Sequence, residues 1–122
     1  MELIPKELVN TIPKLYETEN TDPIIYVKLF TPDSNWSWFI SELSIDKEIC
    51  FGFVISPFVK DWEMGYFSLN ELKSIRGKLG LPIERDLWFK PTKLSYIKRI
   101  YCENWNYEWY KTQRVSRYSK MQ

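Results

Sequence analysis

Residues 22–42 read DPIIYVKLFTPDSNWSWFISE, with one polar turn set between two runs of aromatic and β-branched residues. The turn occupies residues 31–35, where proline fixes φ and the short polar side chains hydrogen-bond their own backbone. Residues 24–30 and 36–43 have the composition of strands. The stretch therefore predicts an antiparallel hairpin. In its second strand, alternation places one set of side chains toward the core: Trp36, Trp38 and Ile40.

Further elements follow from local signals along the chain. We expect two more strands, at residues 49–56 and 64–67, and Gly52 in the first of them indicates a bulge or a close backbone approach. Ser68 and Glu71 have the spacing of a capping box and predict a helix that Gly77 or Gly80 closes. Other helices are expected at residues 6–12 and after Thr92, with Leu94, Ile97 and Tyr101 as an apolar stripe and Lys93, Lys98 and Arg99 facing elsewhere.

The fold class follows from this order of elements. The chain has 122 residues, of which 44% are apolar and 17% aromatic, so it can bury one core. We expect a single compact domain over residues 1–110 and a basic C-terminal tail over residues 111–122. The predicted class is α+β: a small, mostly antiparallel sheet of about four strands, with two or three helices packed on one face.

Charge is divided along the sequence. Residues 1–70 carry five Lys and eleven Asp or Glu, for a net −6, while residues 71–122 carry twelve Lys or Arg and five acids, for a net +7. Two faces of opposite potential, a basic tail and chance remain as alternative explanations.

Composition excludes several kinds of chemistry. The chain has no histidine and only two cysteines, Cys50 and Cys102, which excludes a histidine-dependent triad, a Cys-His nucleophile and a typical zinc site. We expect reduced thiols rather than a disulfide, and neither a cofactor nor a metal. The N-terminus lacks a signal-peptide pattern and no apolar run approaches the ~20 residues that span a bilayer, so a soluble, cytoplasmic protein without membrane contact is expected.

The densest charged cluster in a non-helical segment comprises Glu84, Arg85 and Asp86, beside Trp88 and Lys90. A surface salt-bridge network would explain it, and a partner-binding loop is the functional alternative. A small enzyme that uses Glu84 and Asp86 as acid and base is a third hypothesis, although no nucleophile accompanies them.

A second candidate site would bind single-stranded nucleic acid. Trp36 and Trp38 could stack on unpaired bases, although core packing is the favoured explanation, because large aromatic residues on strands dominate the cores of small domains. The basic tail would contact phosphates. Its basic residues recur every third position: Lys111, Arg114, Arg117 and Lys120.

Three blocks carry a family resemblance: YVKLFTPDSNWSW at residues 26–38, GYFSLNEL at 65–72 and RGKLGLPIERDLWFKPT at 76–92. In this order they resemble the bacterial "domain of unknown function" family numbered twenty-nine fifty-eight, which is carried largely on conjugative plasmids, phages and other mobile elements. The resemblance covers residues 3–97 and implies a role in element maintenance, transfer or defence evasion. It implies no activity, and a family name alone confers no function.

The functional expectation combines the missing catalytic groups with this resemblance. We expect a non-enzymatic binding protein of a mobile element, an anti-defence inhibitor that occupies a host defence or nucleic-acid-processing protein. The partner would be a host- or element-encoded protein, alone or in a nucleoprotein complex.

Overall fold

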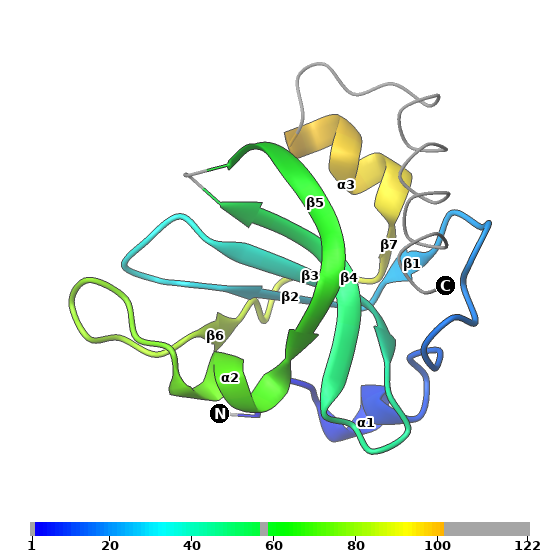
Figure 1. The fold of residues 1–122 in the computed structure, drawn as a ribbon, viewed down its shortest axis with the longest axis horizontal. Helices are drawn as coiled ribbons and strands as arrows, with labels where there is room; N and C mark the ends of the chain where they lie inside the picture. The colour runs from blue at the N-terminus through cyan, green and yellow to red at the C-terminus, as the bar shows by residue number, and fades with distance from the viewer. Residues whose placement is uncertain (1, 57–58, 102–122) are drawn as a thin grey trace.

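A computed structural model describes residues 2–56 and 59–101 and shows a central sheet with helices at both of its ends (Figure 1). The elements in chain order are α1 (Lys6–Val9), β1 (Ile24–Ile25), β2 (Val27–Phe30), β3 (Ser37–Leu43), β4 (Ile49–Ser56), β5 (Val59–Ser68), α2 (Leu69–Ser74), β6 (Glu84–Arg85), β7 (Thr92–Lys93) and α3 (Leu94–Tyr101). None of the described helices has the length and apolar character that a membrane crossing requires.

The main sheet has five strands in the order β5-β4-β3-β2-β6, each antiparallel to its neighbour, and β1 and β7 form a separate two-stranded sheet. The α+β class and a hairpin of β2 with β3 are confirmed. The first strand, predicted over residues 24–30, is divided, because Ile24 and Ile25 pair with β7 instead of with β3. The main sheet was predicted to have about four strands and has five. β5 begins at Val59 rather than at residue 64, and β6 is a fifth strand of the main sheet that the sequence did not predict.

The central strand β3 is buried on both of its faces. Trp38 and Ile40 belong to an apolar cluster that also contains Leu69 and Leu72 of α2. Phe39 points the other way, into a second cluster with residues of α3. The helices therefore do not share one face as predicted: α3 lies at the opposite end of the molecule from α1 and α2 (Figure 1).

Gly52 lies where two backbones approach most closely. It pairs with Ile40 across the β3–β4 ladder, and the register shifts directly afterwards, between Ile40 and Glu42. A Cβ at Gly52 would lie 1.8 Å from the carbonyl oxygen of Phe39. Gly52 was predicted to indicate either a bulge or a close backbone approach, and both occur beside it.

The start of α3 is held by the segment before β1. Thr92, predicted to cap this helix, lies in β7, and Asp22 takes its place. The Asp22 carboxylate accepts hydrogen bonds from the backbone N–H of Ser95 at 3.0 Å and from its hydroxyl at 2.5 Å. The pairing of β1 with β7 brings Asp22 to this helix end.

Two other helix predictions need correction. α2 starts at Ser68 as predicted, with the Ser68 hydroxyl accepting from the Glu71 N–H at 3.3 Å, but it ends at Ser74 with the extended residue Ile75 as C-cap, before either glycine. Lys98, predicted to face away from the apolar stripe, is fully buried on α3. Its Nζ lies 5.7 Å from the centroid of the Phe53 ring, because α3 lies against the sheet.

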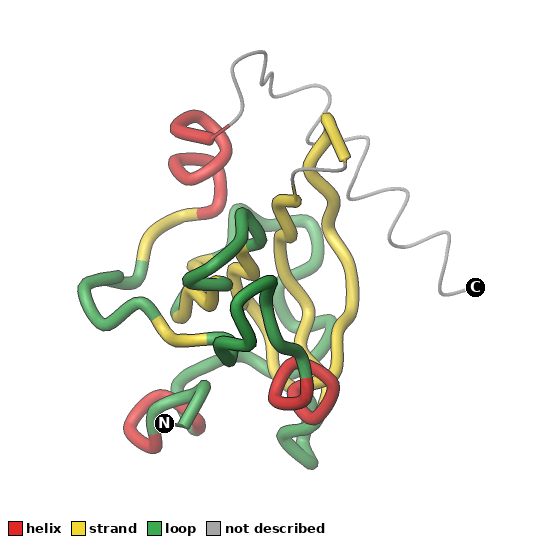
Figure 2. The backbone as a smooth tube through the Cα atoms, turned by 90° about the vertical axis from the view of Figure 1, so that its left-hand side faces the viewer, coloured by secondary structure: helices red, strands yellow, loops and turns green. Residues whose placement is uncertain are grey.

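Two loops are joined at the end of the molecule that faces the viewer in Figure 2. Asp33, in the β2–β3 turn, accepts hydrogen bonds from the backbone N–H groups of Leu79 and Leu81 at 2.7 and 3.3 Å. A Cβ at Gly77 would lie 1.5 Å from the Asp33 carboxylate, so a side chain there would displace this carboxylate from its hydrogen bonds. The backbone N–H groups of this loop therefore bind a carboxylate of the chain itself, that of Asp33.

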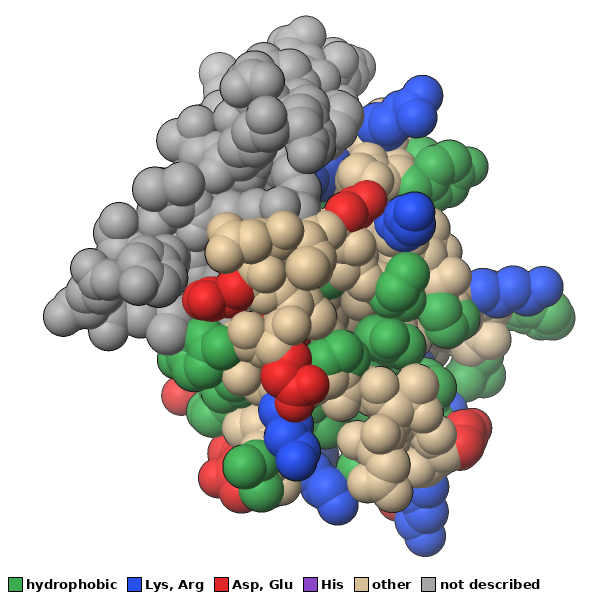
Figure 3. Space-filling model, turned by 90° about the vertical axis from the view of Figure 1, so that its right-hand side faces the viewer, with side chains coloured by type: hydrophobic (Ala, Val, Ile, Leu, Met, Phe, Trp, Pro, Cys, Tyr) green, Lys and Arg blue, Asp and Glu red, His purple; other side chains and the backbone are tan. Residues whose placement is uncertain are grey.

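The opposite end of the molecule has a mixed surface. Acidic and basic side chains are interspersed there with apolar ones (Figure 3). On this face, the charge division along the sequence does not produce a surface of one sign.

Replacing Gly52 with alanine should destabilise the fold strongly, because the added Cβ meets backbone rather than a side chain that could rotate away. We expect the free energy of unfolding to fall by about 3 kcal/mol or more, measured by urea denaturation. Gly65, directly opposite in β5, is the matched control: a Cβ there meets no atom within 4 Å. Gly65→Ala should change the free energy by no more than about 0.5 kcal/mol. Equal effects of the two substitutions would contradict the packing described for β3 and β4.

Candidate functional site

The charged segment predicted as a site forms the edge of the main sheet. In the β2–β6 ladder Glu84 lies opposite Phe30 and Arg85 opposite Leu29, and the Asp86 N–H continues the ladder to the Lys28 carbonyl at 2.9 Å. Side chains alternate between the two faces of a strand. Glu84 and Asp86 therefore share the face of Phe30 and Lys28, while Arg85 lies on the other.

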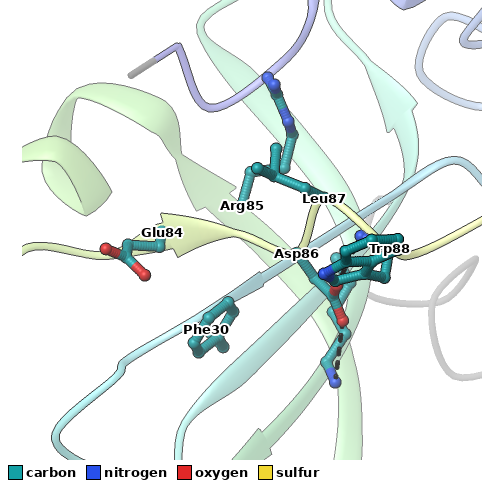
Figure 4. Close-up of a pocket in the computed structure, with 7 residues that line it drawn as sticks. Phe30, Glu84, Arg85, Asp86, Leu87 and Trp88 are labelled. Carbon is teal, nitrogen blue, oxygen red and sulfur yellow. Dashed lines mark hydrogen bonds and ion pairs between the residues drawn. The ribbon is translucent and has the colours of Figure 1, made fainter.

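The contacts of these side chains agree with this alternation. Asp86 Oδ2 lies 3.7 Å from Lys28 Nζ. Arg85 donates from Nη1 to the backbone carbonyl of Glu2 at 2.6 Å, on the opposite side of β6. In Figure 4 the side chains of Glu84, Arg85 and Asp86 extend in three different directions. The three charged groups thus diverge and do not form a common centre.

After Asp86 the chain makes a tight turn that carries two large apolar side chains outward. Asp86 accepts a hydrogen bond at Oδ1 from the Trp88 N–H at 2.9 Å, and its carbonyl accepts one from the Phe89 N–H at 3.2 Å. Leu87 is 65% exposed and Trp88 is 92% exposed. Phe89 turns back inward, where its ring packs edge-on against the Phe39 ring, with 6.1 Å between the ring centroids. We call Leu87 and Trp88 the apolar tip.

A hollow of about 350 Å³ lies beside the apolar tip (Figure 4). It is lined by Lys28, Phe30, Glu84, Arg85, Asp86, Leu87 and Trp88. Sequence reasoning missed Lys28 and Phe30, because only the pairing of β2 with the two-residue strand β6 brings them here. Lys90, predicted with this group, is exposed and does not line the hollow.

Lys28 is held on the inner side of the hollow. Besides the ion pair with Asp86, its Nζ donates to the Tyr101 hydroxyl at 3.3 Å and lies 5.8 and 5.6 Å from the ring centroids of Phe39 and Tyr101. Its charge is therefore directed toward α3 and balanced by a carboxylate.

The tryptophans proposed to stack on bases are packed together instead. The rings of Trp36 and Trp38 lie 5.8 Å apart at an interplanar angle of 19°, and Trp38 is only 6% exposed in the first apolar cluster. Trp38 therefore offers no open face to a base. The basic residues of the second candidate site, Lys111, Arg114, Arg117 and Lys120, lie outside the described residues, as does the expected tail.

Other reactive groups are held within the fold. Cys50 is a fully buried free thiol, and desolvation, with a smaller contribution from the charge of Glu48, raises its pKa to about 12. It is therefore protonated at neutral pH and a poor nucleophile. Within residues 2–56 and 59–101, no three His, Cys, Asp or Glu side chains come together as metal ligands.

A second hollow, of about 500 Å³, lies between residues 14–16 and the turn from Ser44 to Asp46. Hydrogen bonds from the Ser44 hydroxyl, which contributes most, and from the Glu48 N–H lower the pKa of the Asp46 carboxyl group. Because these bonds shape the turn, the Asp46 carboxylate has a local structural role. Of the two hollows, we therefore take the one beside the apolar tip as the candidate site.

The fold and the site define a small α+β protein with an exposed apolar tip, a shallow hollow beside it and charged groups that do not converge. Residues 3–100 match the sequence model of the family described as "Protein of unknown function (DUF2958)". The chain therefore belongs to this family, as the resemblance implied, and both the hollow and the tip lie within the matched residues. Searches among curated proteins and among solved structures return no match.

The hydrogen bond from the Trp88 N–H to the Asp86 carboxylate should hold the backbone of the apolar tip in one conformation. In Asp86→Ala the Trp88 amide loses its acceptor, and we expect its hydrogen exchange to accelerate roughly threefold to tenfold, measured by NMR. Asp86→Asn keeps an oxygen acceptor at the same place but removes the ion pair with Lys28, so the amide should remain protected. Unchanged exchange in Asp86→Ala would show that the turn is held by other contacts.

Proposed function

We propose that this chain is a non-enzymatic binding protein that engages a partner protein through the apolar tip and the hollow beside it. The observation that carries the proposal is the 92% exposure of Trp88 on a backbone that the Asp86 carboxylate fixes. A tryptophan left almost wholly in water has not gained the free energy that burial of its large apolar surface supplies. A partner that covers it would gain that energy.

The surroundings of Trp88 support binding over catalysis. Tryptophan is among the residues most enriched at the energetic centres of protein interfaces, and a tip ordered before binding loses less conformational entropy on association. The carboxylates of Glu84 and Asp86 diverge, and Asp86 is paired with Lys28. Neither is placed to share a reacting atom with the other, which counts against the acid–base hypothesis.

The biological setting of the proposal comes from the family. The family resemblance implies carriage on conjugative plasmids, phages and other mobile elements, and such elements must evade the defences of the host. We therefore propose that the partner is a host defence or nucleic-acid-processing protein in the cytoplasm, which the chain inhibits by occupying a surface of it. Direct binding of single-stranded nucleic acid is the alternative that the experiment must separate from this.

The test is affinity capture of partners from host lysate with the full chain, with and without nuclease treatment. We expect one protein to be retained after nuclease treatment, because the contact is made by protein. Trp88→Ala should abolish its recovery. Leu79→Ala and Ile45→Ala remove other strongly exposed apolar side chains, 81% and 79% exposed, from other parts of the surface and should leave recovery unchanged.

Two outcomes would contradict the proposal. Recovery that is lost on nuclease treatment, together with salt-dependent binding of single strands that fails on deleting residues 111–122, would favour the nucleic-acid alternative. Equal loss from Trp88→Ala, Leu79→Ala and Ile45→Ala would show that the apolar tip has no special role.

A further inference from the structure

We propose that the hollow beside the apolar tip accepts an arginine side chain of the partner, with its guanidinium between Glu84 and the aromatic rings of Phe30 and Trp88. This inference rests on the proposed function, because it names the chemistry of the group that the same site receives.

The charges around the hollow leave one carboxylate uncompensated. Asp86 is paired with Lys28, and Arg85 is directed to the other face of β6, where it donates to the Glu2 carbonyl. Among residues 2–56 and 59–101, no hydrogen bond or ion pair engages the Glu84 carboxylate. Arg85 also lines the hollow, but its guanidinium lies on the other face of β6. On the face that carries Glu84, the charges of Lys28 and Asp86 cancel, and the Glu84 carboxylate leaves one negative charge, which favours a cationic ligand over a phosphate or a carboxylate.

The aromatic rings around the hollow suit the same ligand. Phe30 lies directly across the β2–β6 ladder from Glu84, so the ring and the carboxylate are neighbours on one face of the sheet. Trp88 lines the hollow from the side of the apolar tip and is not covered by the rest of the chain. A cation placed over an aromatic ring is attracted by its negative face, most strongly over tryptophan.

Arginine fits this combination better than lysine. Its guanidinium is planar, so it stacks on an aromatic ring while its edge donates two hydrogen bonds to a carboxylate. It also loses less hydration energy than an ammonium group when a protein surface covers it.

The experiment titrates the full-length, ¹⁵N-labelled chain with three small probes: Nα-acetyl-arginine amide, Nα-acetyl-citrulline amide and Nα-acetyl-lysine amide. Citrulline has the shape of arginine without its charge. The readout is the indole N–H signal of Trp88, assigned by its disappearance in Trp88→Ala. We expect saturable shifts with the arginine probe, weaker binding of the lysine probe and no saturable shift with the citrulline probe.

Substitution of the carboxylate completes the test. Glu84→Gln removes the charge and keeps the shape, and should weaken binding of the arginine probe by about threefold to fivefold, the change expected on loss of one surface ion pair. Glu71→Gln, at an exposed carboxylate on α2, is the matched control and should leave binding unchanged. Arginine and citrulline probes that bind equally, lysine that binds as tightly as arginine, or Glu84→Gln that binds like the wild type would each overturn the inference.

Failure of this inference and failure of the proposed function give different results. If Trp88→Ala abolishes capture of the partner while the arginine probe does not bind, the apolar tip is an interface but the hollow does not take arginine. If Trp88→Ala leaves capture unchanged, the proposed function fails whatever the probes do.

Discussion

The close approach of β3 and β4 at Gly52 is the constraint on which the rest of the structure depends. β3 packs on both faces, with Phe39 on the side of α3 and with Trp38 and Ile40 on the side of α2. Both clusters are fully formed only if β4 lies tight against β3, and a side chain at Gly52 would collide with the Phe39 carbonyl. The register shift that follows leaves Glu42 fully buried, where its carboxylate accepts hydrogen bonds from the backbone N–H groups of Tyr16 and Thr18.

The candidate site follows from the same strand. β2 pairs with β3 in a register that sets Lys28 opposite Phe39, and β6 adds to the free edge of β2. Phe89 packs on Phe39 and so returns the chain to the core immediately after Trp88. The apolar tip therefore comprises two residues between two points fixed to the sheet, which holds the backbone that carries these exposed side chains.

The sequence predicted the parts of the fold that have strong local signals. The hairpin of β2 and β3, the whole of β4 and the start of α2 at Ser68 follow from turn residues, alternation and a cap. β5 was predicted too short because Lys60, Asp61 and Glu63 are typical of a loop, yet an edge strand tolerates charge. β6 and β7 have two residues each, too few for any periodicity. The cap from Asp22 and the burial of Lys98 depend on tertiary packing and have no local signal.

The residues of the candidate site also divide into those that the sequence predicted and those that only the structure assigns. The density of charge at residues 84–86 and the neighbouring Trp88 singled out this segment from sequence. Lys28 and Phe30 could not be assigned to it, because they are 56 and 54 residues away from Glu84 and reach it through strand pairing. The direction of Arg85 also required the structure, since alternation matters only once β6 is known to be a strand.

Contact between the apolar tip and a partner protein is tested most directly by site-specific photo-crosslinking in the host cell. A photoreactive phenylalanine analogue would replace Trp88 in the full chain, and the same analogue at Leu79 and Ile45 would report on other strongly exposed positions. We expect one defined protein adduct from position 88 and none of that adduct from positions 79 and 45. No protein adduct at position 88, or the same adduct from all three positions, would contradict the proposed contact.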